Sequence, residues 1–346
     1  MTELCIFLVI NQLRNYCEKS DDETWAKTMT NNKTAPFKYH EFVSSASAFI
    51  TGELQEKIRV TKFLIAGNGS IGNPTAMALA RSGAENITCA DPETIETSNL
   101  ARQEFFFNQV GRNKADITRQ NILAINPNAT YSVKSVSEGI TYDNVGRLVS
   151  EADIIIDGID ICSSEIAWEL HKTASMLRRP VIVGYDLAGT AMLMIIRYDL
   201  ETLKPLNGDI SEETIQEFSK VKAKYHEGKI TESQYLDYVY QVLTGPINPL
   251  LVPIEQYKEI IGRRDGCNST AQLGTTARLI SVMIVESVKQ ILIGEPVKGV
   301  ISIDAPSVVR KNNPNIITRL IYMLKTLSVI KKRAQEVNAM LANIDS

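Results

Sequence analysis

The stretch FLIAGNGSIGNPTAMALARSG, residues 63–83, decides the fold of this chain. It predicts a buried strand, then a turn that carries Gly67, Gly69 and Gly72, then an alanine-rich helix. Glycines at these spacings permit a tight turn and let backbone N–H groups approach a phosphate, while the start of the helix carries partial positive charge. The stretch is therefore typical of a phosphate-binding strand–turn–helix unit, and a glycine turn without a ligand is the simpler alternative.

Strand-like and helix-like stretches alternate from residue 60 to residue 200. Nearly continuous apolar strands that alternate with helices predict an α/β fold, with a mainly parallel sheet and helices on both faces. The expected strands are FLIAG, NITCAD, TYSVKS, ADIIIDG, PVIVGYD and AMLMIIRYD, and the expected helices are PTAMALARSG, RNKADITRQNILAI, TYDNVGRLV and SSEIAWELHKTASML.

The alternation breaks at residues 205–262, where we expect a helical hairpin as an insertion. Thr231 and Gln234 have the spacing of a capping box at the start of its second helix. The predicted parts are an N-terminal helical extension at 1–58, a nucleotide-binding domain at 59–204 and 263–310, the insertion at 205–262, and a C-terminal helical tail at 311–346.

Composition narrows the class of protein. The 346 residues carry a net charge of −3, which gives no general reason to bind nucleic acid or a membrane. No apolar run approaches the roughly 20 residues of a membrane-spanning helix, and the opening MTELCIFLVI lacks the basic start of a signal peptide. Five scattered cysteines without a CxxC pair argue against disulfides and against zinc. These features predict a cytoplasmic protein.

Two chemistries use such a glycine loop: hydride transfer from a dinucleotide, and activation of a carboxylate by ATP. Asp91 ends the next expected strand, 19 residues after Gly72, where a carboxylate accepts from ribose hydroxyls of NAD, FAD or ATP. The stretch DPETIETSNLARQ at 91–103, with the later GRNK and IIIDGIDI, favours ATP. Its cations suit the charge that develops on an attacked α-phosphate, and a carboxylate suits magnesium. An NAD-binding oxidoreductase would leave these groups without a role.

In these motifs the chain resembles the ThiF/MoeB/HesA family, the adenylating relatives of ubiquitin-activating enzymes. The family pattern is GxGxxG, then D-x-D-x-V-x-x-S-N-L-x-R-Q, then a lysine about ten residues on, then D-x-x-D after a later strand. The matching segments here are GNGSIG at 67–72, DPETIETSNLARQ at 91–103, Lys114, and Asp157 with Asp160. The resemblance covers residues 55–200, resumes at 274–293, and implies a Rossmann-like fold.

The resemblance also implies roles for the matching residues, with Arg102, Lys114 and Asp160 as the catalytic group. Simpler alternatives are that Asn99 only caps the helix after it and that Asp157 is structural. The implied contacts are Gly67, Gly69 and Gly72 in the phosphate loop, Asp91 at the ribose, Glu93 (where aspartate is usual) near ribose or metal, Asn99, Arg102 and Gln103 at the phosphates, Lys114 at phosphate and transition state, and Asp160 on magnesium.

The sequence departs from the family pattern at three points. Many members carry an arginine ahead of the glycine loop that reaches across a dimer to the phosphates. Here Glu41 stands in that place, and only Arg14 and Arg59 precede the loop. The zinc-binding CxxC pairs of many members are missing. No cysteine is flanked like a thioester-forming nucleophile, although Cys162 and Cys267 are candidates, so we expect adenylation without a thioester.

The resemblance implies an ATP-dependent adenylyltransferase that forms an acyl-adenylate and releases pyrophosphate. The expected partner is the C-terminus of a ubiquitin-like or small carrier protein, or a peptide, and the expected assembly is a homodimer. A peptide-modifying member, a tRNA-dehydratase-type member and a non-catalytic nucleotide-binding module are the alternatives.

The insertion carries aromatic and basic side chains. We expect the tyrosines to pack against the sheet domain, with docking of a peptide as the alternative, and the lysines to form a solvated face. The tyrosines are Tyr225, Tyr235, Tyr238 and Tyr240, and the lysines are Lys222, Lys224 and Lys229.

Overall fold

The computed structural model describes residues 36–243, 247, 249–262 and 272–344. The chain divides into two compact units, Met1–Phe42 and Val43–Ser346. In the described end of the first unit, the rings of Phe37 and Phe42 pack with their centroids 5.3 Å apart. A short helix, α3 (Tyr39–Val43), crosses the boundary between the units. The second unit contains the sheet and the helices that cover it.

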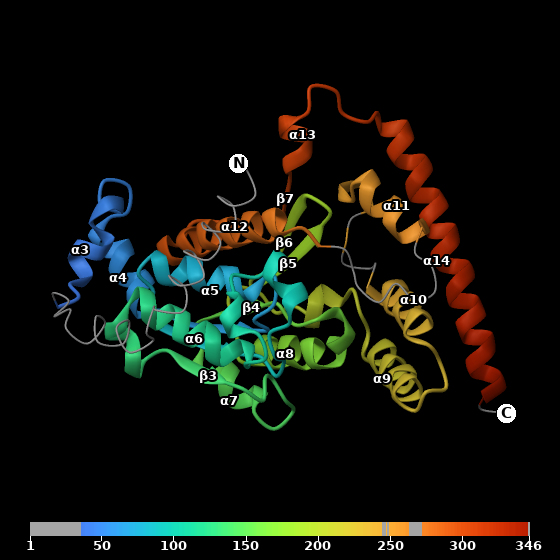
Figure 1. The fold of residues 1–346 in the computed structure, drawn as a ribbon, viewed down its shortest axis with the longest axis horizontal. Helices are drawn as coiled ribbons and strands as arrows, with labels where there is room; N and C mark the ends of the chain where they lie inside the picture. The colour runs from blue at the N-terminus through green and yellow to red at the C-terminus, as the bar shows by residue number, and fades with distance from the viewer. Residues whose placement is uncertain (1–35, 244–246, 248, 263–271, 345–346) are drawn as a thin grey trace, which may run out of the picture. The chain divides into compact units, whose positions relative to one another are not determined.

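Seven strands of the described residues form one sheet (Figure 1). The pairs among β1 to β5 are parallel, whereas β6 runs antiparallel to both of its neighbours, β5 and β7. This arrangement confirms the predicted Rossmann-like, mainly parallel α/β fold. The spatial order is β3 (Lys134–Val136), β2 (Asn86–Ala90), β1 (Lys62–Ala66), β4 (Ile154–Asp157), β5 (Val181–Leu187), β6 (Thr190–Ile196) and β7 (Val300–Asp304).

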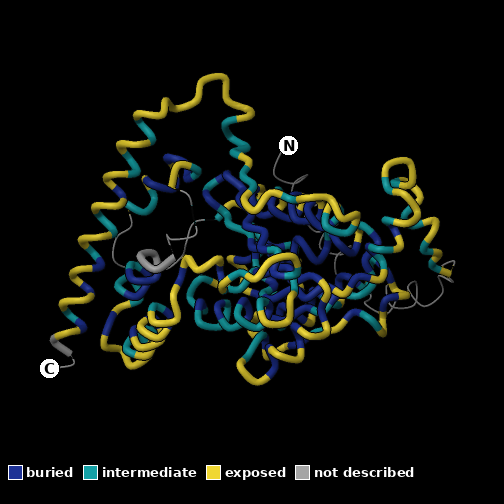
Figure 2. Tube along the Cα trace, turned by 180° about the vertical axis from the view of Figure 1, so that it is seen from behind, coloured by how far each residue is buried: buried dark blue, intermediate teal, exposed yellow. Residues whose placement is uncertain are grey.

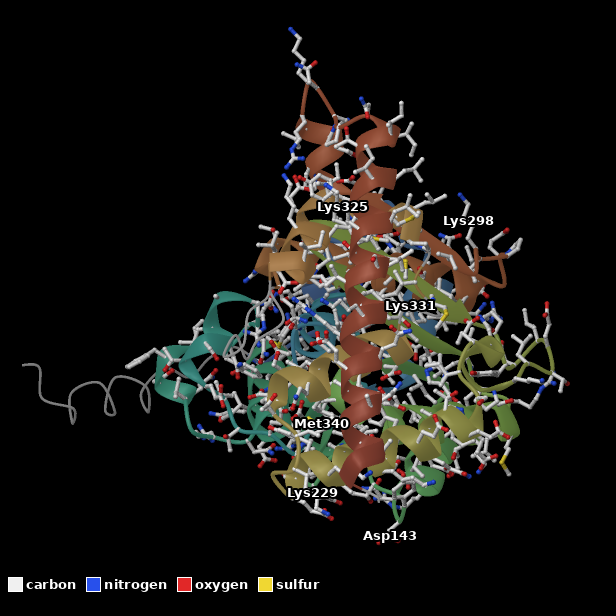
Figure 3. All side chains as sticks on the ribbon, turned by 90° about the vertical axis from the view of Figure 1, so that its right-hand side faces the viewer. Asp143, Lys229, Lys298, Lys325, Lys331 and Met340 are labelled. Carbon is white, nitrogen blue, oxygen red and sulfur yellow. The ribbon has the colours of Figure 1, made fainter. Side chains whose placement is uncertain are left out.

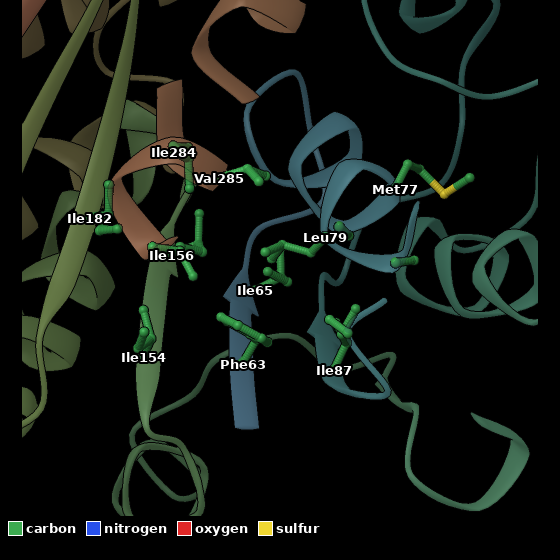
Figure 4. Packing of buried hydrophobic residues seen from close by; sticks show 14 of the residues in the cluster. Phe63, Ile65, Met77, Leu79, Ile87, Ile154, Ile156, Ile182, Ile284 and Val285 are labelled. Atoms are coloured by element: carbon green, nitrogen blue, oxygen red, sulfur yellow. The ribbon is translucent and has the colours of Figure 1, made fainter. Parts of the chain in front are cut away.

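Alternate side chains of the central strands enter two separate cores. In β1, Phe63 and Ile65 face helices α4, α5, α6 and α12, and Figure 4 shows the core on that side. Leu64 and Ala66 face α7 and α8 on the other side. Because both faces are covered, the strands are continuous apolar runs. The helices are α4 (Gly52–Val60), α5 (Gly72–Arg81), α6 (Lys114–Ile125), α7 (Val145–Glu151), α8 (Ser164–Met176), α12 (Gly274–Ile293) and the short α13 (Ala305–Val309).

Local turn chemistry explains two features of the sheet that the sequence pattern does not predict. β3 is shorter than TYSVKS because Pro127–Tyr131 forms a 3-10 helix, in which the Thr130 hydroxyl donates to the Pro127 carbonyl at 2.7 Å. β5 and β6 form a hairpin because Ala188 and Gly189 take φ values of 48° and 101°. Positive φ at both loop residues is typical of a type I′ turn.

The predicted helical hairpin is present as α9 (Glu212–His226) and α10 (Glu232–Leu243). Its capping box is confirmed, because the Thr231 amide donates to Gln234 Oε1 at 2.8 Å and the Gln234 amide donates to Thr231 Oγ1 at 3.3 Å. A further helix, α11 (Ile254–Gly262), follows the proline-rich connection and is not predicted by the sequence pattern.

The long C-terminal helix α14 (Ile316–Ile344) packs against α10 and α11. Phe218, Tyr235 and Tyr238 of the hairpin share a core with Leu341 of α14. The expected packing against the sheet domain is confirmed for Tyr235, whose hydroxyl donates to the Cys162 carbonyl at 3.0 Å, but α14 covers this core as well. The side chain of Tyr240 lies outside the described part. Figure 2 shows the buried and the exposed faces of α14. No helix among the described residues combines the length and apolarity needed to cross a bilayer.

Candidate active site

The glycine loop follows β1 and is held by backbone packing. Gly67 has φ +84°, and a Cβ added there would lie 2.3 Å from the carbonyl oxygen of Gly158. A Cβ at Gly72 would lie 1.8 Å from the Gly67 carbonyl oxygen. At Gly69 the nearest atom to such a Cβ is Gln103 Nε2, at 3.8 Å. Steric contact therefore requires glycine at 67 and 72, whereas Gly69 borders open space at the start of α5, where an anion is favoured.

Asp91, at the end of β2, is buried and closes over the loop. Its Oδ2 accepts from the Asn68 amide at 2.6 Å and its Oδ1 accepts from the Glu93 amide at 2.8 Å. Burial raises the pKa of Asp91, and those two hydrogen bonds and the charge of Lys114 oppose the rise. Since each carboxylate oxygen can accept a further hydrogen bond, Asp91 is oriented and still able to bind a ribose hydroxyl.

Lys114 starts α6 and points back to the segment after β2. Its side chain is 5% exposed, and its ammonium contacts the carboxylate of Glu93, which is 60% exposed. The Lys114 amide also donates to the Glu93 carbonyl at 2.9 Å. Asn113 caps α6 and donates through Nδ2 to the Asp91 carbonyl at 2.9 Å. The structure thus brings together three residues, Asp91, Glu93 and Lys114, that the sequence separates.

The segment after Glu93 forms a 3-10 helix, Thr97–Ala101, that ends at Arg102. Asn99 Oδ1 accepts from the Glu96 amide at 2.9 Å, so Asn99 closes a capping box within this helix. Arg102 donates through Nη1 to the Ser98 carbonyl at 3.0 Å. In the described part of the chain, Arg102 Nε and Gln103 Oε1 are buried without a hydrogen-bond partner. The oxygen of Asn99 therefore supports the loop, and Arg102 and Gln103 keep polar atoms for another group.

The two aspartates after β4 have different surroundings. Asp157 is buried, and its oxygens face the Ile159 amide at 3.0 Å and the ring of His171 at 3.1 Å. The other ring nitrogen of His171 lies 3.0 Å from the Tyr198 hydroxyl, which accepts from the Leu206 amide. An ionised carboxylate only accepts hydrogen bonds, so Nε2–H of His171 donates to Asp157, and in the neutral ring Nδ1 accepts from the Tyr198 hydroxyl. This network favours a structural role for Asp157.

Asp160 is exposed and starts the 3-10 helix Ile161–Ser163, where its Oδ1 accepts from the Cys162 amide at 2.8 Å. The Cys162 thiol also lies within hydrogen-bonding reach of this carboxylate. No group of three or more His, Cys, Asp or Glu side chains among the described residues is arranged to hold a metal ion. A carboxylate at this edge suits magnesium that takes its remaining ligands from phosphates and water.

A hollow of about 410 Å³ lies beside Asp160, between its 3-10 helix and the helical hairpin, and Cys162, Lys222 and Tyr235 are among its lining residues. Burial raises the pKa of the Cys162 thiol to about 12, and the charge of Asp160 adds to the rise. The thiolate needed for a thioester is therefore disfavoured at Cys162, while Cys267 lies outside the described residues.

Lys222 corrects the expectation of a solvated lysine face. Its Nζ lies 2.5 Å from Glu165 Oε1, so this lysine joins α9 to α8. Lys229, by contrast, is half exposed and pairs with Glu227, in keeping with the solvated face.

Of the two arginines ahead of the loop, Arg59 does not take the place of the missing one within its own chain. Arg14 lies outside the described residues. Arg59 ends α4, before β1, and its Nε lies 2.8 Å from Glu85 Oε2. Because β1 separates it from the glycine loop by five residues of about 3.3 Å each, Arg59 lies at the opposite edge of the sheet.

Three further polar residues, which no sequence motif indicates, lie near the glycine loop and Arg102. Asn73 is buried, accepts from the Glu104 amide at 2.6 Å and donates to Thr118. Asp186, on β5, accepts from the Leu273 amide at 3.1 Å at the start of α12. Burial raises the pKa of Asp186 to about 6. Thr276 lies beside it. An acidic residue closing the expected strand PVIVGYD is the signal that could have indicated Asp186.

Fold and site together define an α/β protein with a Rossmann-like sheet, whose glycine loop adjoins Asp91 and Gln103. The chain matches the profile of the ThiF family over residues 43–320 and belongs to that family. This finding confirms the family indicated by the sequence motifs.

Individual relatives are more distant. The chain is 25% identical over 182 residues to "Adenylyltransferase and sulfurtransferase UBA4" of Candida albicans, which covers 52% of this chain and 41% of that protein. It is 26% identical over 145 residues to "Sulfur carrier protein ThiS adenylyltransferase" of Escherichia coli, which covers 41% of this chain and 55% of that protein. The chain thus matches about half of the length of these relatives. The crystal structure of PaaA shares the fold, with a TM-score of 0.52, 19% identity and 80% of both chains covered.

Proposed function

We propose that this chain is an ATP-dependent adenylyltransferase. A substrate carboxylate oxygen bonds to the α-phosphorus of ATP, the bond from that phosphorus to the bridging oxygen breaks, and pyrophosphate leaves an acyl-adenylate. The observation that carries the proposal is a set of polar groups near the loop: Gln103 faces Gly69, the ammonium of Lys114 lies near Asp91, and Gln103 Oε1 and Arg102 Nε are buried without partners. Membership of the ThiF family supports it.

Each group has a physical task in this reaction. The loop amides and the start of α5 bind phosphate, and Asp91 holds the ribose. Lys114 and Arg102 stabilise the negative charge that grows on the α-phosphate oxygens. Lys114 suits this task because its ammonium is buried and already oriented by Glu93, so little reorganisation is needed when ATP binds. Binding the carboxylate beside ATP adds the gain from positioning.

The proposal includes a magnesium ion at the carboxyl ends of the strands, where a carboxylate oxygen can bind it. Asp160 would hold it, because this carboxylate is exposed and its contacts with the Cys162 amide and thiol leave lone pairs on its oxygens for an ion. When bound with the phosphates, the ion supplies positive charge.

The proposed substrate is the carboxyl terminus of a small ubiquitin-like carrier protein or of a peptide. The Escherichia coli relative is named for the sulfur carrier protein ThiS, which supports the first class. We also propose a homodimer in the cytoplasm, where the free cysteines Cys89 and Cys162 would stay reduced.

Exchange of pyrophosphate into ATP tests the proposal, with candidate carboxylates added one at a time. Asp160→Ala is expected to abolish exchange while the thermal unfolding of the protein changes little, because Asp160 is exposed. Asp143→Ala is the matched control, since Asp143 is another exposed aspartate (Figure 3). Exchange at the parent rate in Asp160→Ala would reject the metal site. ATP binding without exchange under any carboxylate would favour a non-catalytic module, and tighter binding of NAD than of ATP would favour an oxidoreductase.

A further inference from the structure

The polar groups of the site lie side by side at the carboxyl ends of neighbouring strands. From β2 across β1 and β4 to β5, the strand ends carry Asp91, the glycine loop, Asp160 and then Asp186. Neighbouring strands lie about 4.8 Å apart, so β5 is two strands, or about 10 Å, beyond the glycine loop. If the ribose lies at β2 and the phosphates at the loop, the group that attacks the phosphate approaches from β5.

Asp186 points to the same face of the sheet as the glycine loop. Side chains alternate along β5, and a Cβ at Gly184, two residues earlier, would lie 2.8 Å from both Ile71 of the loop and Ile280 of α12. Asp186 therefore faces α12 near its first turn, where its Oδ2 accepts from the Leu273 amide. Gly274 brings the same turn against Arg102, because a Cβ there would lie 3.1 Å from the Cα of Arg102.

Several buried polar atoms meet here without partners. Gln103 Oε1 and Arg102 Nε have no hydrogen bond within the described part of the chain. Asp186 Oδ1 and Thr276 Oγ1 have none of good geometry there, and the Thr276 side chain is close enough to Asp186 to oppose the rise of its pKa. Thr276 and Gln103 are 2% and 3% exposed. Arg102 is close enough to lower the pKa of Asp186, but no ion pair among the described residues joins the two. Buried polar atoms are rarely left unpaired, and such a group of them indicates a place that a ligand completes.

The chemistry of Asp186 selects the group that it binds. An ionised carboxylate only accepts hydrogen bonds, so its free oxygen requires a donor. We infer that Asp186 binds an N–H group next to the carboxylate that is activated, as the amide N–H of the last residue of a peptide or carrier protein would provide. The inference rests on the proposed function and adds a selection rule: a carboxylic acid without a neighbouring N–H is a poor substrate.

Stable analogues of an acyl-adenylate test this rule without catalysis. The probes are N-acetylglycyl-sulfamoyladenosine and 4-oxopentanoyl-sulfamoyladenosine, which differ by one N–H in place of a CH₂. Glycyl-sulfamoyladenosine presents an ammonium group, and sulfamoyladenosine without an acyl group reports on the nucleotide site alone. In isothermal titration calorimetry the parent protein is expected to bind the N-acetylglycyl probe at least about tenfold more tightly than the 4-oxopentanoyl probe, as one hydrogen bond to a charged acceptor provides.

Variants at Asp186 separate the inference from the proposed function. Asp186→Ala is expected to lose the preference for the N–H probe while binding sulfamoyladenosine like the parent. Asp186→Asn, which is nearly isosteric, is expected to reduce the preference and serves if the alanine variant fails to fold. Equal binding of the two matched probes by the parent, or an unchanged preference in the variants, overturns the role of Asp186. Failure of the parent to bind any probe rejects the proposed function instead.

Discussion

Replacement of Lys114 by methionine separates the stability of the site from its chemistry. Methionine keeps an unbranched apolar side chain in the 5% exposed position and removes the ammonium. Glu93, which loses its partner, is 60% exposed, and an ion pair with an exposed member contributes at most about 1 kcal/mol to the free energy of unfolding. We therefore expect a loss of no more than about 1 kcal/mol in the free energy of unfolding, because the released carboxylate regains water.

The expected loss in rate is much larger. Removal of a single preorganised donor from a developing oxyanion costs about 10²- to 10³-fold in kcat, or about 3–4 kcal/mol in the barrier. The assay is pyrophosphate exchange at saturating ATP, with urea unfolding of the same preparation. Lys298→Met is the matched control, because Lys298 is an exposed lysine (Figure 3). Exchange by Lys114→Met within about threefold of the parent would show that this ammonium does not meet the transition state.

Three other positions give sharp expectations. Gly72→Ala should destabilise the chain by more than about 3 kcal/mol in urea unfolding, because its Cβ would lie 1.8 Å from a backbone oxygen, while Gly146→Ala, with no atom within 4 Å, should be neutral or stabilising. Asp186→Asn should raise the free energy of unfolding. The pKa of Asp186 is about 6 in the folded chain and 3.8 in the unfolded chain, so the stability of the parent protein falls as the pH rises through this window. The gain from the asparagine therefore approaches about 3 kcal/mol at pH 7.5 and is about half of that at pH 5. A gain that grows toward low pH would contradict the burial argument. Cys162→Ser should keep parental pyrophosphate exchange, since the pKa of this thiol is about 12, and loss of exchange with an intact fold would assign it a chemical role.

Local sequence signals predict the parts of this protein that local physics determines. The glycine spacing predicts the loop because Gly67 and Gly72 have contacts that admit no Cβ. The Thr231 and Gln234 pair predicts a helix start because both hydrogen bonds of its capping box lie within four residues of chain. The turn at Ala188 and Gly189 is different, because its residues predict a hairpin only once β6 is known to pair with β5.

The remaining parts depend on long-range packing. Asp186 lies 84 residues after Arg102 in the sequence, and only the start of α12 brings the two residues together. The tyrosines of the hairpin have a helical pattern that predicts burial but does not name the partners, which are the segment at Ile161 and Cys162 and the distant helix α14. His171 likewise becomes part of a network only because Tyr198, on a later segment, closes it.

The hydrogen bonds of the site suggest why it divides into a fixed part and an open part. Asn73 and Asn113 use their side-chain amides to join α5, the segment after β2 and the start of α6. Arg102 and Asp186 instead retain buried atoms without partners. A rigid frame that holds unsatisfied charges costs stability in the free protein, and a ligand that supplies both a phosphate and an N–H donor removes that cost. The same energetic difference would favour the bound acyl-adenylate over ATP alone, so the acyl-adenylate analogue should raise the unfolding temperature more than ATP does at the same free ligand concentration.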